Sequence, residues 1–174
     1  MHGLIEFLLS NDPRAAAARS RFIFKIVPML NPDGVALGHF RTDTRGVNLN
    51  RCYETPDAVL HPSIHTFKRY FLYCHARYRC AWYIDMHAHT SKKGCFLYGN
   101  HLPGPSAVDI CTYAKLVSMN TPFVNFNACN FTEQNMKSKA KSDGGVSKEA
   151  TSRVRFYEET GLVHSYTLEC NYDS

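Results

Sequence analysis

The middle of the chain contains an apolar run that ends in polar side chains, Cys80-Ala81-Trp82-Tyr83-Ile84 followed directly by Asp85-Met86-His87-Ala88-His89. The first five residues are apolar without interruption, as expected for a strand of a parallel sheet that is buried on both faces. In open α/β sheets, functional sites lie outside the carboxyl ends of the strands. The run therefore predicts a buried strand over residues 80–84 and a cluster of functional side chains directly after it.

Three further apolar segments predict three more strands. They cover residues 22–27, 95–98 and 163–170, and the last alternates with a period of two. Helices are predicted over residues 3–10, from Pro13 onward, over 62–77 and over 107–117. Strands that alternate with helices predict an α/β fold with a mixed, largely parallel sheet flanked by helices. The length of 174 residues predicts one domain over residues 1–174.

The composition is that of a globular protein. Hydrophobic residues make up 44% and charged residues 20% of the chain, which excludes intrinsic disorder. No apolar run reaches the ~18 residues that span a bilayer, and the net charge of +5 is mild and diffuse. We therefore expect neither a membrane nor a nucleic acid as a partner. The seven cysteines include no Cys-x-x-Cys pair and are expected to be buried and reduced, as in a cytosolic protein.

Three of the predicted strands end in residues that suit binding or catalysis. These are Asn31-Pro32-Asp33-Gly34, the segment from Asp85 to His89, and Glu169. Each signal alone is weak, because a histidine at a strand end is more often structural than a metal ligand. Asp85 itself has two interpretations, a group that orients a neighbouring ligand or a cap of the strand end. The order of the three segments along one chain gives them more weight.

This order resembles the metallocarboxypeptidase family. The resemblance is carried by residues 24–34 (FKIVPMLNPDG), by Asn48-Leu49-Asn50-Arg51, by residues 83–87 (YIDMH) and by residues 165–169 (SYTLE). The longer runs over residues 38–51 and 164–172 resemble the cytosolic carboxypeptidase subfamily, whose members remove glutamates from tubulin tails. The resemblance covers nearly the whole chain and implies a zinc carboxypeptidase-like fold.

The resemblance also implies roles for individual residues. His87 matches a zinc ligand, and Glu169 matches the general base and acid that acts on the attacking water and the leaving amine. Asn50 and Arg51 match the pair that binds the C-terminal carboxylate of the substrate, for which a guanidinium fork is suited. Arg41 matches the arginine that stabilises the developing oxyanion.

Other assignments retain an alternative. Tyr157 matches the family's mobile tyrosine that caps the substrate, but a core or surface aromatic residue is an equal interpretation. Arg153 is the candidate for binding a glutamate side chain, because a buried carboxylate needs a positively charged partner. Lys92 and Lys93 are the alternative source of that charge. His89 is interpreted as a wall of the pocket rather than as a second ligand.

The family takes its first two zinc ligands from an His-x-x-Glu motif, and this sequence contains none. We therefore expect an incomplete carboxypeptidase catalytic domain, truncated at both ends. The implied function is that of a cytoplasmic, microtubule-associated metallocarboxypeptidase with Zn²⁺ as cofactor, which removes glutamate from polyglutamylated tails such as those of tubulin. The alternative is a non-catalytic module that binds acidic tails through Arg41, Arg51 and a mobile basic loop over residues 137–148. An unrelated metal hydrolase built on His87 and His89 is a minor third interpretation.

Overall fold

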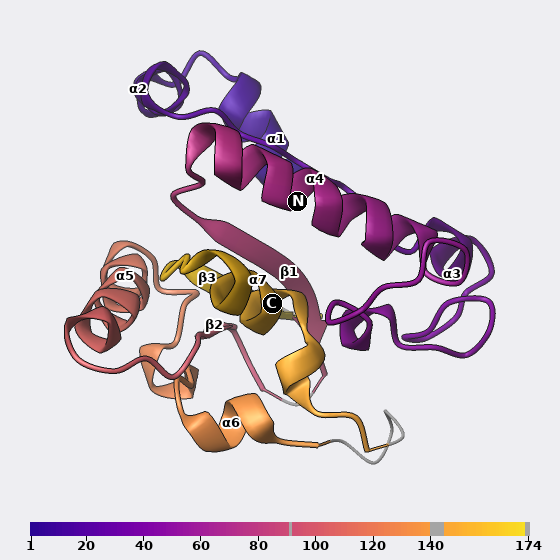
Figure 1. The fold of residues 1–174 in the computed structure, drawn as a ribbon. Coiled ribbons are helices and arrows are strands. Elements are labelled where there is room, and N and C mark those ends of the chain that lie inside the picture. The colour runs from indigo at the N-terminus through magenta and orange to yellow at the C-terminus, as the bar shows by residue number, and fades with distance from the viewer. Residues whose placement is uncertain (91, 140–144, 173–174) are drawn as a thin grey trace.

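In the computed structural model, which describes residues 1–90, 92–139 and 145–172, helices surround a small central sheet (Figure 1). The sheet has three strands in the order β1-β3-β2. β1 (Tyr83–His89) and β3 (Ser165–Asn171) are parallel, whereas β2 (Cys95–Tyr98) pairs with β3 in the antiparallel sense. The prediction of a mixed α/β sheet flanked by helices is confirmed.

The α-helices of the described residues include the four that the sequence predicts and three that it does not. The predicted ones are α1 (His2–Leu9), α2 (Pro13–Arg21), α4 (Pro62–Tyr78) and α5 (Pro105–Asn120). The others are α3 (Pro32–Ala36), α6 (Glu133–Lys137) and α7 (Ser152–Thr160), and there are short 3₁₀ helices η1 (Leu49–Arg51), η2 (Phe126–Ala128) and η4 (Lys148–Ala150). These additional elements are short, so the sequence pattern offers too few turns to reveal them.

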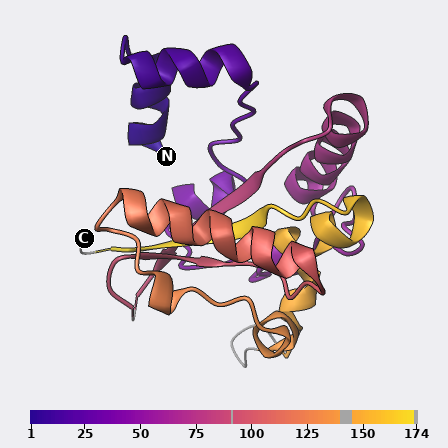
Figure 2. The same ribbon diagram turned by 90° about the vertical axis from the view of Figure 1, so that its left-hand side faces the viewer.

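Helices cover both faces of the sheet. On one face α4 and α7 enclose a core of Tyr53, Ile64, Phe71, Tyr83, Phe156 and Leu162. On the other face α5 packs over a second core of Leu97, Leu102, Ile110, Ala114 and Tyr166. Figure 2 shows α5 lying along the sheet, with α1 and α2 standing apart from these layers.

The predicted strand over residues 22–27 is wrong. The segment joins none of the described strands, and its side chains are exposed, Ile23 to 75%. A central strand needs a partner on each side, but the described sheet ends at β1, which pairs only with β3. Apolar composition without such partners does not make a strand. Phe22 instead packs its ring against Trp82, with the centroids 5.7 Å apart.

The predicted strand over residues 80–84 is displaced along the chain. β1 begins at Tyr83, because its pairing with β3 starts there, opposite Ser165, and it continues to His89. The polar segment that was expected to follow the strand therefore belongs to it. This places Asp85, His87 and His89 on a rigid element rather than on a loop.

The seven cysteines are all free, but only Cys74 is buried, and the other six are half-buried. The expectation of complete burial therefore holds for Cys74 alone. Within the described parts of the chain, no helix has both the length and the apolar character needed to cross a bilayer. The predicted basic loop over residues 137–148 lies partly outside the described residues, since 140–144 are not among them.

The first core depends on Phe156, which is fully buried and stacks on Phe71 with centroids 3.8 Å apart. Phe156→Ala should lower the free energy of unfolding by about 3–5 kcal/mol, because it leaves a cavity between α4, α7 and the sheet. Urea unfolding measures the change. The control Phe123→Ala removes a ring that is 67% exposed and should shift stability by at most about 0.5 kcal/mol. A loss of less than about 1 kcal/mol for Phe156→Ala would contradict this packing.

Candidate active site

Strand pairing gathers the chemically important side chains on one face of the sheet. In the β1–β3 register His87 lies opposite Glu169, and Asp85 lies opposite Thr167. Paired residues share a face, and residues two apart in a strand share it as well. Asp85, His87 and Glu169 therefore all point to the face that α7 covers. The predicted cluster of His87 with Glu169 is present in the structure.

The carboxylate of Asp85 organises this cluster. Its Oδ2 lies 2.8 Å from Nε2 of His87 and accepts a hydrogen bond of 2.9 Å from the hydroxyl of Ser152. The amide nitrogen of Asn50 lies 3.4 Å from the same oxygen. A hydrogen bond between the carboxylate and the ring requires a proton on Nε2, and in the neutral ring Nδ1 then carries the lone pair that a ligand role needs. Of the two interpretations of Asp85, the structure supports the group that orients a histidine.

Burial and neighbouring charges set the protonation of the pair. Burial acts to lower the pKa of His87, but the hydrogen bond and charge of Asp85, with the charge of Glu169, outweigh it and raise that pKa. The pKa of Glu169 is raised chiefly by burial, with Asp85 adding to the effect, while His87, His89 and Arg41 oppose it. A raised carboxyl pKa makes Glu169 a better proton acceptor near neutral pH.

Asn50 and Arg51 reach the site from η1. Both polar atoms of the Asn50 side chain have partners within the protein. Its Oδ1 accepts a hydrogen bond of 3.2 Å from the backbone amide of Ser152. Its Nδ2 lies close to the carboxylate of Asp85 and the ring of His87. Nη1 of Arg51 donates to the carbonyl of Asn50 at 2.9 Å. η1 is thereby held against the start of α7, which the sequence did not indicate. The structure brings Asn50 next to His87, and Arg51 follows Asn50 in η1.

Arg41 lies in a loop that Asp43 holds in shape. The backbone amides of Arg45 and Val47 donate to Oδ1 of Asp43 at 2.9 and 2.8 Å, and the guanidinium of Arg45 donates to Oδ2. His39 Nδ1 contacts the carbonyl of Asp43 at 2.9 Å. Arg41 is an exposed residue, yet its charge lowers the pKa of both His87 and Glu169, so it acts on the site.

The Asn-Pro-Asp-Gly motif supports the same loop. Asn31 caps α3 by accepting from the backbone of Gly34 at 3.2 Å and donates from its side chain to the carbonyl of Thr42 at 3.0 Å. A Cβ at Gly34 would lie 2.5 Å from that carbonyl oxygen, so only glycine allows this close approach. The motif therefore serves to position the segment that carries Arg41.

Arg153 is buried at the start of α7, with only 2% of its surface exposed. Its Nη1 donates to the carbonyl of Gly99 at 2.5 Å and to Oδ1 of Asn100 at 2.6 Å. Among the described residues its Nε has no hydrogen-bond partner and its guanidinium forms no ion pair. Burial lowers the pKa of Arg153 to about 10, although the interactions with Asp85 and Tyr98 act to raise it. A buried cation with an unsatisfied donor is costly unless an anion joins it.

Three other candidates lie outside the centre of the cluster. Tyr157 packs against the core beneath α5, so the structure does not bring it to Glu169 and favours the core-aromatic alternative. Lys92 and Lys93 are exposed, and the ammonium of Lys92 lies over the rings of Phe96 and Tyr98. His89 is on the same face as His87, with its ring 5.2 Å from that of Phe96, in keeping with a pocket wall.

The site does not by itself enclose a metal ion. His87 offers a suitable nitrogen, but no group of three or more His, Cys, Asp or Glu side chains in the described ranges is placed to hold a metal. A catalytic zinc site takes three protein ligands. The described residues therefore do not fit a complete zinc site, and a zinc ion would need ligands besides His87.

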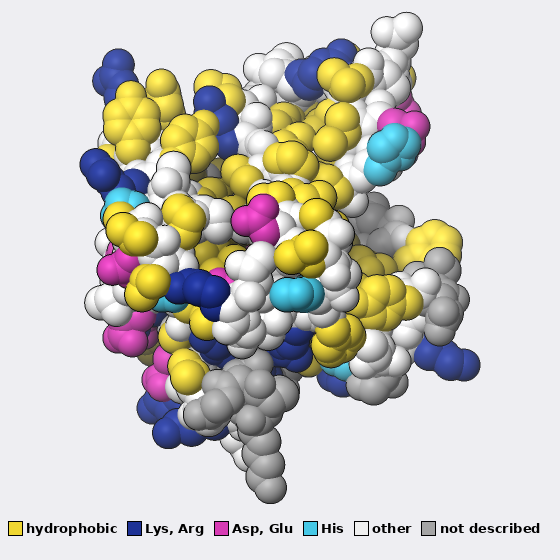
Figure 3. All heavy atoms as spheres, turned by 90° about the vertical axis from the view of Figure 1, so that its right-hand side faces the viewer, with side chains coloured by type: hydrophobic (Ala, Val, Ile, Leu, Met, Phe, Trp, Pro, Cys, Tyr) yellow, Lys and Arg dark blue, Asp and Glu magenta, His cyan; other side chains and the backbone are white. Residues whose placement is uncertain are grey.

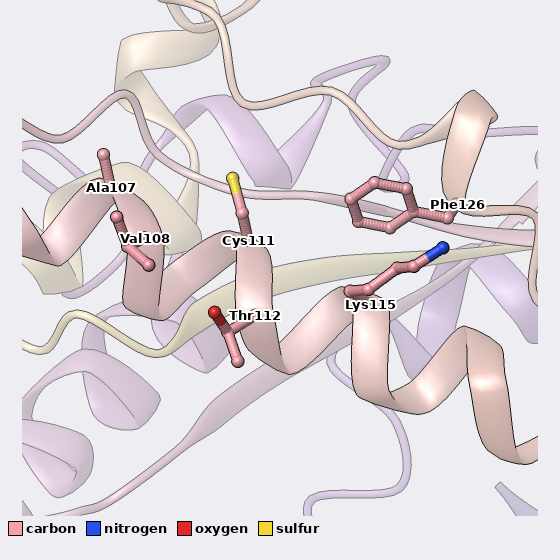
Figure 4. A pocket seen from close by; sticks show the side chains of 6 residues that line it. All are labelled: Ala107, Val108, Cys111, Thr112, Lys115 and Phe126. Atoms are coloured by element: carbon pink, nitrogen blue, oxygen red, sulfur yellow. The ribbon is translucent and has the colours of Figure 1, made fainter.

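Figure 3 faces the side of the molecule toward which β1 runs, and Lys and Arg side chains show in the middle of this face beside histidines. A separate shallow groove of about 420 Å³ lies between α5 and η2 (Figure 4). Its wall is almost entirely apolar, formed by residues such as Val108, Cys111 and Phe126, with no catalytic group. The groove is therefore not part of the candidate active site.

A model of the zinc carboxypeptidase family matches residues 1–171. The chain belongs to the zinc carboxypeptidase family, a family of metallocarboxypeptidases. Cytosolic carboxypeptidase-like protein 5 of Mus musculus is 35% identical over 260 aligned residues, which cover 99% of this chain and 29% of the relative. Cytosolic carboxypeptidase 1 of Danio rerio is 36% identical over 184 residues, covering 97% and 15%. The chain thus spans less than a third of the length of these relatives.

Solved structures support the fold. A metallo-carboxypeptidase from Burkholderia cenocepacia superimposes with a TM-score of 0.74 at 23% identity, covering 97% of this chain and 42% of that one. A metallo-carboxypeptidase from Pseudomonas aeruginosa gives a TM-score of 0.72 at 21% identity, with the same coverage. At these identities the likeness establishes the architecture alone.

The sequence missed two contributors to the site, Ser152 and Asp43. Ser152 precedes Arg153 on a helix that was not predicted, and its bond to Asp85 spans 67 residues. Asp43 was present in the resemblance but had no assigned role. The spacing Asp-x-Arg-x-Val could have indicated a carboxylate that caps its own loop, since aspartate commonly bonds to backbone groups two residues later.

Asp43→Ala should lower the free energy of unfolding at pH 7 by about 1–3 kcal/mol, because buried donors lose their acceptor. Burial acts to raise the pKa of Asp43, but the bonds from Val47 and Arg45 outweigh it and hold the pKa below its usual value. A lowered folded-state pKa stabilises the protein above the unfolded pKa of about 3.9, and this contribution is lost as the pH falls through the folded pKa.

The difference between the wild type and Asp43→Ala should therefore be constant from about pH 7 to pH 5 and shrink below about pH 4. Chemical unfolding at several pH values measures it. Asp109→Ala, at an exposed position of α5, is the control and should change stability little at any pH. A difference that grows in acid would show that Asp43 does not act through its carboxylate.

Proposed function

We propose that this chain forms the substrate-binding and acid–base part of a zinc metallocarboxypeptidase that removes glutamate from polyglutamylated protein tails, such as those of tubulin. The observation that carries the proposal is the register that sets Glu169 opposite His87, on a face that also receives Asn50 and the charge of Arg41. A carboxylate of raised pKa beside cationic groups suits the hydrolysis of a C-terminal peptide bond.

Glu169 is the proposed general base and acid. Its half-buried carboxylate accepts a proton from the attacking water and later donates it to the amine that leaves. Arg41 provides a positive charge for the oxyanion that forms between these two steps. Arg51 binds the C-terminal carboxylate of the substrate, a contact for which its planar fork of donors is suited.

Arg153 is the proposed partner of a glutamate side chain. Its buried guanidinium forms no ion pair with a carboxylate among the described residues, so a substrate carboxylate that reached it would balance its charge. The names of the relatives, cytosolic carboxypeptidases, support a cytoplasmic location for the whole protein. Association with microtubules follows as an expectation from the proposed tubulin substrate.

The lack of a three-ligand metal group among the described residues favours one alternative, a non-catalytic module that binds acidic tails. Zinc content distinguishes the two functions. The longest natural protein that contains this sequence should bind about one zinc ion per chain if it is a peptidase. Zinc far below that ratio, together with salt-sensitive binding of polyglutamate, would support the binding module instead.

The proposal is tested by incubating that natural protein, loaded with zinc, with a peptide that ends in several glutamates. Released glutamate is measured over time, and the same peptide with an amidated C-terminus is the control. We expect release from the free-carboxylate peptide only. A folded, zinc-loaded protein that releases no glutamate from either peptide would refute the proposed activity.

Glu169→Gln should leave the fold intact and reduce turnover about 10²–10⁴-fold, because an amide cannot accept the proton of the attacking water. The rate of glutamate release measures the effect, and thermal unfolding checks the fold. Glu6→Gln, an exposed change in α1, is the matched control and should keep the wild-type rate. A Glu169→Gln protein with more than about a tenth of the wild-type rate would remove Glu169 from the acid–base role.

A further inference from the structure

Two cysteines face each other across β2 and β3. Cys95 is the first residue of β2, and its partner in the antiparallel register is Cys170 of β3. Directly opposed residues share a face of the sheet, so both side chains point to one side. That side is the one that α5 covers, whereas Glu169 points to the other. The pair is half-buried and lies outside the candidate active site.

The backbone hydrogen bonds make this a non-hydrogen-bonded pair of the ladder. The amide of Asn171 donates to the carbonyl of Gly94 at 3.1 Å, so the hydrogen-bonded pair is the next one along. The amide of Cys95 donates instead to the carbonyl of Phe123, and its carbonyl accepts from the amide of Asn125, both at 2.8 Å. Non-hydrogen-bonded pairs have the closer side chains, with Cα atoms about 4.5 Å apart. A disulfide joins Cα atoms about 4.4–6.8 Å apart, so the ladder suits one here.

The sheet holds the two thiols at this spacing. β3 is the central strand of the described sheet, between β1 and β2, and β2 is bonded on its outer side to residues 123–125. The thiols already interact, because the pKa of Cys170 is raised to about 11 by burial and then by a hydrogen bond with Cys95. The two sulfur atoms therefore meet without rearrangement of either strand.

We propose that Cys95 and Cys170 are a reversible modification site, at which a small-molecule disulfide such as oxidised glutathione converts the two thiols into a cross-strand disulfide. The structure shows the reduced form of this site, since both cysteines are free. Disulfides of proteins in reducing compartments are usually transient and respond to redox conditions. The site is independent of the proposed peptidase activity.

The exchange requires only the two thiols and the small disulfide. One cysteine, as its thiolate, attacks a sulfur of oxidised glutathione, so that a mixed disulfide forms and one glutathione thiolate leaves. The other cysteine then attacks the protein sulfur of the mixed disulfide and releases the second glutathione. The two thiol protons pass through water to the leaving thiolates. Two protein thiols are oxidised to one disulfide, and one glutathione disulfide is reduced to two thiols.

The environment of the pair affects the two steps differently. Because the thiolate is the attacking species, the raised pKa of Cys170 slows its reaction near neutral pH. The second step is favoured, since the opposed strands hold the two sulfur atoms in place for it. The cross-link is therefore expected to form slowly and to persist as a disulfide between β2 and β3 until a reductant removes it.

The experiment uses the longest natural protein that contains this sequence. It is incubated with oxidised glutathione, denatured and alkylated, and its peptides are identified by mass spectrometry. Alkylation of Cys95 and Cys170 should fall together about ten-fold or more relative to the reduced protein, with a peptide that links the two. Dithiothreitol should restore both thiols. Fragment ions locate the link, because Cys111 lies in the same tryptic peptide as Cys95.

Three variants show whether the link depends on this pair. Cys95→Ser and Cys170→Ser should each abolish it and leave the remaining cysteine as a thiol or a glutathione adduct. Cys129→Ser is the matched control, because Sγ of Cys129 also lies beside β2, accepting from the amide of Leu97 at 3.2 Å, but lies outside the ladder. It should leave the link unchanged. If a serine variant does not fold, as judged by circular dichroism, the alanine variant replaces it with the same expectations.

Three results of the mapping would overturn the inference. They are glutathione adducts without a link, a link from Cys95 or Cys170 to a different cysteine, and a link that dithiothreitol does not reverse. Hydrogen exchange then tests whether the disulfide fits the sheet. Exchange of the β2 amides should slow in the oxidised form, because the cross-link hinders separation of β2 from β3. Exchange that did not slow would contradict the geometry on which the inference rests.

Discussion

The carboxylate of Asp85 is the contact on which the arrangement of the site depends. It joins β1 to the start of α7 through Ser152, brings η1 close through Asn50, and sets the ring of His87. Asn50 and Ser152 lie 35 and 67 residues from Asp85 in the chain, so these two contacts exist only once the layers have assembled. A half-buried carboxylate at such a junction is stable because donors from several elements satisfy it. The same contacts orient the histidine for a ligand role.

The second constraint is the burial of the positively charged guanidinium of Arg153. Among the described residues the guanidinium of Arg153 bonds to one backbone carbonyl and one side-chain amide and forms no ion pair with a carboxylate. Cations held in this way lose hydration without gaining an ionic partner. Such an arrangement is unfavourable for folding and favourable for binding an anion.

Much of the site could be predicted from sequence because its order is local. A period of two along β1 sends Asp85 and His87 to one face, whereas Glu169 joins that face through the register of β3 with β1. Short-range contacts also explain why Asn31 caps α3 and why position 34 is a glycine, since a Cβ there would collide with the side chain of Asn31. The prediction of a strand over residues 22–27, which was made from their apolar composition, was wrong. Whether such a run joins a sheet depends on its partners, which composition does not report.

The sequence by itself determined the fold class, the helices α4 and α5, and the motifs that carry His87, Glu169 and the Asn50–Arg51 pair. Each is encoded by periodicity or by the order of short motifs, which do not require knowledge of distant contacts. Only the tertiary structure decided that Arg153 is buried and that Tyr157 packs against the core beneath α5. Those outcomes depend on how η4 and α7 dock onto η1 and the sheet. Docking of this kind is set by contacts between residues far apart in the chain, and short-range patterns do not contain that information.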